Sequence, residues 1–132
     1  MNSGMTGDGI EPEIFDRLQR ALAADPKGLT DLYRDYLADA RRKLAELKQA
    51  LVSADGERLR SQAHYLKGSS QITGMRGIAQ RCAALEETAC SGNQSETERL
   101  VHEVAAAIDA GERELIQKLG EAVTPAGEGA AW

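Results

Sequence analysis

Residue types that mark several other classes of protein are scarce in this sequence. Its 132 residues include only two cysteines and two histidines, so neither a disulfide framework nor a cluster of zinc ligands is expected. No apolar run approaches the roughly 18 residues of a membrane-spanning helix, and residues 1–9 lack the basic and apolar regions of a secretory signal. No GxGxxG, phosphate-binding loop or HExxH pattern occurs. The sequence therefore predicts a cytoplasmic protein with no metal or cofactor of its own.

The two cysteines, Cys82 and Cys90, are predicted to be reduced thiols. They fall within one predicted helix, where eight residues at 1.5 Å rise separate their Cα atoms by about 12 Å. A disulfide needs Cα atoms within about 7 Å of each other. Reduced thiols fit a cytoplasmic protein.

Acidic residues outnumber basic ones, 21 to 16, which gives a formal net charge of −5. This balance disfavours nucleic acid and anionic membranes as partners, because both attract basic surfaces. Hydrophobic residues make up 42% of the chain, and β-branched residues are scarce beside Ala and Leu. The composition favours helices over sheet, and the length suggests one domain.

Apolar residues recur at helical spacing in five segments that are separated by short breaks. The last four segments are long and amphipathic, and short loops between such helices imply antiparallel neighbours. The sequence predicts an all-α protein: an antiparallel up-down four-helix bundle over residues 10–120, with a short additional N-terminal helix. Residues 1–9 and 121–132 are predicted to be flexible tails. The predicted helices span about 12–23, 29–52, 56–73, 75–90 and 95–119.

Local signals place several helix ends. Asp55 can cap the start of the third helix, and Gly74 is a plausible left-handed stop at its end. Residues 95–98 (S-E-T-E) match a capping box, so the fifth helix is predicted to begin at Ser95. Pro125 is expected to stop any further helix.

Residues spaced three, four or seven apart, most of them apolar, predict the buried stripe of each bundle helix. In the third helix the stripe becomes small and polar towards its end, which would allow a neighbouring helix to approach closely. The predicted stripes are Leu37, Ala40, Leu44, Leu47 and Leu51; Leu59, Ala63, Leu66, Ser70 and Thr73; Ile78, Cys82, Leu85 and Ala89; and Val101, Val104, Ile108, Leu115 and Leu119.

The most informative residue pattern surrounds His64 in the third helix. His64 falls at the edge of the buried stripe, and Lys67 and Gly68, three and four residues on, neighbour it on the helix surface. Glycine inside a helix costs roughly 1 kcal/mol relative to alanine, which indicates that something approaches the backbone there. An accessible imidazole beside a cation and a bare backbone suits a nucleophile for an anionic phosphoryl group. The alternative is a surface histidine beside a surface lysine, with Gly68 packing against another helix.

Residues 64–75, H-Y-L-K-G-S-S-Q-I-T-G-M, resemble the signature of the histidine-containing phosphotransfer (HPt) domain, roughly H-x-L-K-G-S-[SA]-x-x-x-G-[ALM]. Ile78, Cys82 and Glu86 also follow the family pattern, and the likeness extends over about residues 11–119. The resemblance implies that His64 is phosphorylated on Nε2, that Lys67 neutralises the phosphoryl charge and that Gly68 leaves space for a partner. It also implies that Glu86 accepts a hydrogen bond from Nδ1–H; the alternative is a solvated charge.

The resemblance further implies a phosphorelay intermediate that works with response-regulator receiver domains and a hybrid histidine kinase. The receiver would supply Mg²⁺, and the chain, which is not itself a kinase, would need no cofactor. Expected docking residues are Gln71, Tyr65, Leu37 and Tyr33, and a monomer is expected. Two alternatives stay open at this point: a phosphate-independent helical adaptor, and the phosphoacceptor module of a larger histidine kinase. The second histidine, His102, lacks the Lys-Gly pair and is predicted to face solvent.

Overall fold

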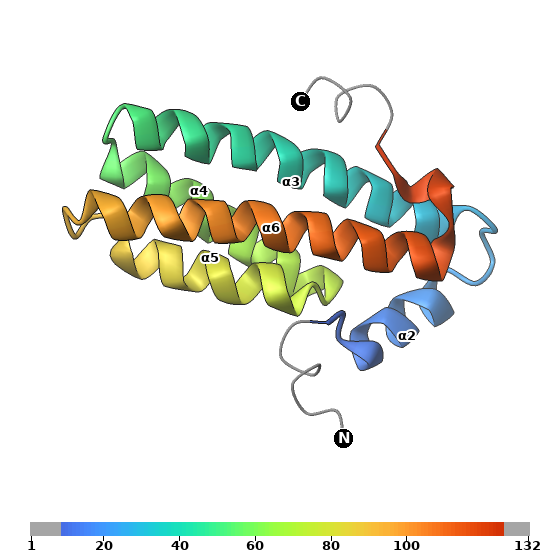
Figure 1. Ribbon diagram of the computed structural model, residues 1–132. Helices are drawn as coiled ribbons and strands as arrows, with labels where there is room; N and C mark the ends of the chain where they lie inside the picture. The colour runs from blue at the N-terminus through green and yellow to red at the C-terminus, as the bar shows by residue number, and fades with distance from the viewer. Residues whose placement is uncertain (1–8, 126–132) are drawn as a thin grey trace.

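The computed structural model describes residues 9–125, and these residues form helices and no β-strand. A short helix, α2 (Pro12–Ala21), precedes four longer ones, so the predicted all-α fold with one short and four longer helices is confirmed (Figure 1). None of the helices in this part of the chain is long and apolar enough to cross a membrane. The longer helices are α3 (Gly28–Val52), α4 (Gly56–Thr73), α5 (Arg76–Thr88) and α6 (Gln94–Leu119).

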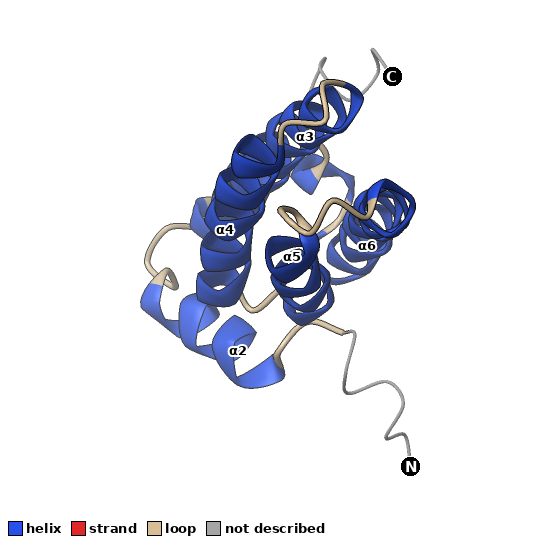
Figure 2. Ribbon diagram, turned by 90° about the vertical axis from the view of Figure 1, so that its left-hand side faces the viewer, coloured by secondary structure: helices blue, strands red, loops and turns tan. Residues whose placement is uncertain are grey.

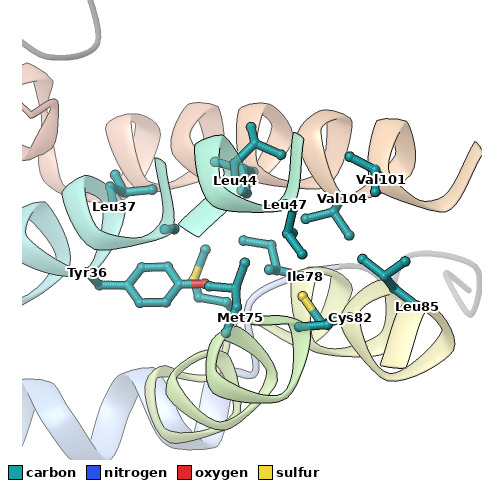
Figure 3. Packing of buried hydrophobic residues seen from close by; sticks show 14 of the residues in the cluster. Tyr36, Leu37, Leu44, Leu47, Met75, Ile78, Cys82, Leu85, Val101 and Val104 are labelled. Carbon is teal, nitrogen blue, oxygen red and sulfur yellow. The ribbon is translucent and has the colours of Figure 1, made fainter. Parts of the chain in front are cut away.

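The four long helices surround one core. Each helix packs against the next along the chain, and α6 returns to pack against α3, so the bundle closes (Figure 2). The predicted stripes of α4 and α5 are buried throughout, and Leu51 and Leu119, at the ends of the other two stripes, are partly buried. Leucine, isoleucine and valine side chains from facing helices fill the centre (Figure 3). Burial of these side chains is the main stabilising contribution to the bundle.

Two buried tyrosines of α3 fix the end of α4. The hydroxyl of Tyr36 is 2.6 Å from Ser70 Oγ, and the hydroxyl of Tyr33 donates to the Thr73 carbonyl oxygen at 2.7 Å. Ser70 is fully buried, as its place on the small, polar part of the stripe predicted. These bonds satisfy polar groups in the core and set the register between α3 and α4.

The prediction that Tyr33 and Leu37 belong to the docking surface is wrong. Both side chains are fully buried, and the ring of Tyr33 stacks on that of Phe15 with centroids 5.8 Å apart. Both lie on the inward face of α3, so no visiting protein can touch them without opening the bundle.

The predicted signals at the two ends of α4 are confirmed. The Asp55 side chain accepts from the Arg58 amide at 3.2 Å. Gly74 takes the left-handed conformation (φ 77°), which glycine adopts without steric penalty. The prediction for α6 is wrong: the helix begins at Gln94, and Asn93 is the cap whose side chain accepts from the Glu96 amide at 3.1 Å. Asparagine caps a helix as well as serine does.

The C-terminal boundary also differs from the prediction. Gly120 (φ 93°) ends α6, and residues Glu121–Val123 form a 3₁₀-helix, η1, that packs on α3 and α6. Val123 is fully buried, and Arg34 Nη1 donates to the Ala122 carbonyl oxygen at 3.3 Å. Residues 121–125 are therefore part of the bundle and not a flexible tail. Residues 1–8 and 126–132 of the two predicted tails lie outside the described residues. Helices α2 and α5 each end two residues earlier than predicted.

Candidate functional site

His64 lies on the outer surface of α4 with 66% of its side chain exposed. Its neighbours Ala63 and Leu66 are fully buried, so the histidine stands at the edge of the stripe that α4 turns inward. A rigid, well-packed helix thus presents an imidazole to solvent. The predicted accessibility of this ring is confirmed.

Glu86 of α5 bonds to the imidazole. Its Oε2 is 2.8 Å from His64 Nδ1. An ionised carboxylate can only accept a hydrogen bond, so this contact places the ring proton on Nδ1. In the neutral ring Nε2 then carries the lone pair, as a nucleophile requires. The carboxylate is only 20% exposed, so the alternative of a solvated charge at Glu86 is excluded.

The same carboxylate also holds Lys67. Its Nζ is 2.8 Å from Glu86 Oε1, and the lysine side chain is 25% exposed. The ion pair with Lys67, followed by the bond to His64, holds the pKa of Glu86 below its usual value, so the group stays charged near neutral pH. The sequence predicted that Lys67 neighbours His64; the structure adds that both share one acceptor.

Gly68 leaves a bare patch of helix one turn beyond His64. A Cβ built at this position would meet nothing within 4 Å among the described residues. The alternative in which Gly68 packs against another helix is therefore wrong. The missing side chain instead leaves room on the solvent side of the imidazole.

Exposed apolar side chains flank this patch. Ile72 is 73% exposed, and Tyr65, seven residues earlier on the same side of α4, is also exposed. Lys43 Nζ lies 4.0 Å from the centre of the Tyr65 ring. Sequence reasoning selected Tyr65 but missed Ile72, although an isoleucine off the buried stripe and four residues after Gly68 is a signal that could have been used.

Gln71, the other predicted docking residue, is exposed at the edge of an open groove. The groove lies between α2, α4 and α5, and its walls include Ile14, Ala79 and Ala83. Small residues on α5 make this hollow. It continues the same α4–α5 seam that holds the bonds between His64, Lys67 and Glu86.

His102 lies on α6, on the other side of the bundle from α4 (Figure 2). It is exposed, as predicted. Val101 before it is fully buried, and no Lys-Gly pair follows it. Of the two histidines, only His64 stands in an arrangement of acceptor, cation and bare backbone.

Comparisons with known proteins found a matching family model and solved structures of similar fold. The family model described as Hpt domain matches residues 31–124. The histidine-containing phosphotransfer protein B of Pseudomonas aeruginosa PAO1 has a similar structure, with a TM-score of 0.72 and 24% identity over 83% of this chain and 90% of that one. A rice protein described as a putative histidine-containing phosphotransfer protein gives a TM-score of 0.77 and 20% identity over 92% and 86%. At these identities the two structures show a shared fold. No curated protein sequence gives a significant match.

Proposed function

The chain belongs to the Hpt domain family, and from that premise we propose that His64 receives a phosphoryl group from a receiver aspartate and passes it to another. Hpt domains generally carry phosphoryl groups in phosphorelays and do not act as kinases themselves. The single observation that supports His64 as the carrier is its arrangement: an exposed ring whose Nδ1 is bonded to Glu86, beside the bare backbone of Gly68.

The proposed reaction is an in-line displacement at phosphorus. The lone pair of Nε2 forms the new P–N bond, while the P–O bond of the aspartyl phosphate breaks and its electrons return to the receiver carboxylate. The reverse steps deliver the group to a second receiver. Mg²⁺ bound by the receiver stabilises the charge on the transferring group. The chain contributes the positioned nucleophile, and Lys67 supplies a positive charge for the phosphoryl oxygens.

We propose that the receiver docks on the exposed face of α4. Gly68 lets the aspartyl phosphate approach the ring, and Tyr65 and Ile72 give the apolar contacts that such an interface needs at its centre. Gln71 lies at the rim beside the groove. A small interface of this kind fits a partner that binds, exchanges one group and leaves.

An adaptor that does not carry phosphate gives no physical reason for this arrangement. Such a protein would gain helix stability from an alanine in place of Gly68. It would also have no need to hold the tautomer of an exposed histidine. A module of a larger kinase would use the same site in the same way, so the chemistry proposed for His64 applies to both cases.

The proposal is tested by incubating the chain with a receiver domain carrying radiolabelled phospho-aspartate. The expected product is a label on this chain that is labile in acid and stable in base, as an N-phosphoryl bond is. The label is lost in His64→Gln and retained in His102→Gln, which removes a histidine from the same chain without touching the site. A label that persists in His64→Gln contradicts the proposal.

A further inference from the structure

Glu86 contacts two partners, His64 and Lys67, with one carboxylate oxygen each. Oε2 contacts Nδ1 of His64, and Oε1 contacts Nζ of Lys67, each at 2.8 Å. We infer that the negative charge of Glu86 retains the Nδ1 proton on phosphorylated His64, and so keeps the phosphoryl group transferable to higher pH. This inference rests on the proposed function and assigns Glu86 a role after the transfer, as a positioning residue for a proton.

The proton matters because it decides which leaving group departs. When Nε2 forms the P–N bond, the ring keeps its Nδ1 proton and becomes a phosphorylated imidazolium. Onward transfer breaks the P–N bond and returns the electron pair to Nε2, which leaves neutral imidazole. If the Nδ1 proton is lost first, the departing group is an imidazolate anion, a far stronger base and a far poorer leaving group. Transfer therefore proceeds through the fraction of the phosphorylated protein that holds this proton.

The charges around the ring make Glu86 the group that opposes loss of the proton. On α4, Lys67 and Arg60 flank His64 at three residues after and four residues before, and Lys43 of neighbouring α3 lies over a tyrosine ring. These cations favour a neutral ring. Arg60 is already paired with a glutamate of its own helix. Glu86 of α5 brings the negative charge that bonds directly to the imidazole.

Arrival of the phosphoryl group also frees Glu86 for this task. In the unphosphorylated protein the Glu86 carboxylate contacts both His64 and Lys67, with one oxygen each. Phosphoryl oxygens offer Lys67 a second anionic partner on the same face of α4. As the ammonium turns to the phosphoryl group, the Glu86 charge acts on the imidazolium alone.

The expected size of the effect follows from the charge. An opposite charge at hydrogen-bond distance shifts the pH midpoint of a titrating group by about one unit or more. Because the imidazole is exposed, we expect a shift at the lower end of that range. Glu86→Gln keeps an oxygen that accepts from Nδ1–H but removes the charge. In that variant the midpoint of the phosphohistidine titration should fall by about one pH unit, and transfer should slow about tenfold above both midpoints.

The experiment phosphorylates the full chain with phosphoramidate, a small phosphoryl donor, and so needs no receiver for the first readout. The ³¹P resonance of the phosphohistidine is followed against pH in the wild type, in Glu86→Gln and in Glu87→Gln. Glu87 is exposed and adjacent on α5, so its variant loses the same charge without losing the bond. Onward transfer to a receiver with Mg²⁺ is then measured at a pH below and a pH above the midpoints.

The inference predicts a lowered midpoint and slowed alkaline transfer in Glu86→Gln alone, with equal rates at the lower pH. Equal midpoints in all three proteins overturn the inference while leaving the proposed function intact. A rate that falls equally at both pH values also overturns it, because a misplaced ring would act at every pH. If a phosphorylated receiver also leaves no phosphohistidine at His64 of the wild type, the proposed function itself fails.

Discussion

A substitution at Gly68 is expected to raise the stability of the fold and to slow phosphoryl transfer. A Cβ at this position meets nothing within 4 Å among the described residues. Gly68→Ala therefore adds helix propensity without a clash, which should raise the free energy of unfolding by about 0.8–1 kcal/mol. For a domain of this size the midpoint of thermal unfolding should rise by about 3–5 °C.

The same variant should carry phosphoryl groups less well. The methyl group occupies the space through which a receiver aspartate reaches the imidazole, and displacing reacting atoms by about 1 Å can cost a hundredfold in rate. We expect transfer from a phosphorylated receiver to slow about tenfold in Gly68→Ala, and further in Gly68→Gln, with helix content unchanged. The assays are thermal unfolding by circular dichroism and single-turnover transfer of radiolabel.

Gly111→Ala is the matched comparison on α6. A Cβ there would lie 2.8 Å from Met75 Cε, so Met75 must move and the gain in stability should shrink or vanish. Transfer should not change, because α6 lies across the bundle from α4. A Gly68→Ala protein that is more stable and transfers at the wild-type rate would refute the steric argument. One that is less stable would show that Gly68 serves the fold.

Three further predictions concern the core. Tyr36→Phe leaves the buried Ser70 hydroxyl without its 2.6 Å partner, so urea unfolding should show a loss of about 1–2 kcal/mol; a neutral change would count against that bond. Val123→Ala should lower the free energy of unfolding by about 1–2 kcal/mol, although the residue follows the last α-helix. An unchanged free energy of unfolding would instead support the predicted flexible tail. Burial raises the pKa of Tyr33 from 10.0 to about 12. The unfolded chain therefore loses this proton first, and stability should fall from pH 10 to about 12. The decline should be smaller in Tyr33→Phe, and an equal decline would contradict the assignment.

Hydrophobic periodicity accounts for most of what the sequence predicts about the fold. The stripes of α4 and α5 are spaced so regularly that helical geometry alone assigns their buried residues, including Ser70 and Cys82. The same periodicity argues against two of the predicted docking residues. Leu37 lies on the predicted inward stripe of α3, and Tyr33 lies four residues before it, so burial of both follows from the pattern.

The structural features that the sequence does not predict depend on contacts between distant segments of the chain. Val123 lies three residues after Gly120, and no local sequence pattern indicates that it is buried in the core. Asn93 and Ser95 are both good caps, and the choice between them depends on where α6 meets its neighbours. The contact of Glu86 with His64 was predicted only through the family resemblance. The two residues are 22 positions apart on different helices, so residue spacing within one helix cannot predict it. The ion pair of Glu86 with Lys67 became visible only once α4 and α5 were packed together.

The most direct test of the central claim is the ring atom that carries the phosphoryl group. After transfer from a receiver, two-dimensional ¹H–¹⁵N NMR of the ¹⁵N-labelled chain resolves the nitrogens of its two histidines. We expect coupling to phosphorus at Nε2 of one histidine, with the proton still on Nδ1 of the same ring. The signals of that histidine should be absent from His64→Gln. Phosphorus on Nδ1 of His64, on His102 or on a carboxylate would contradict it.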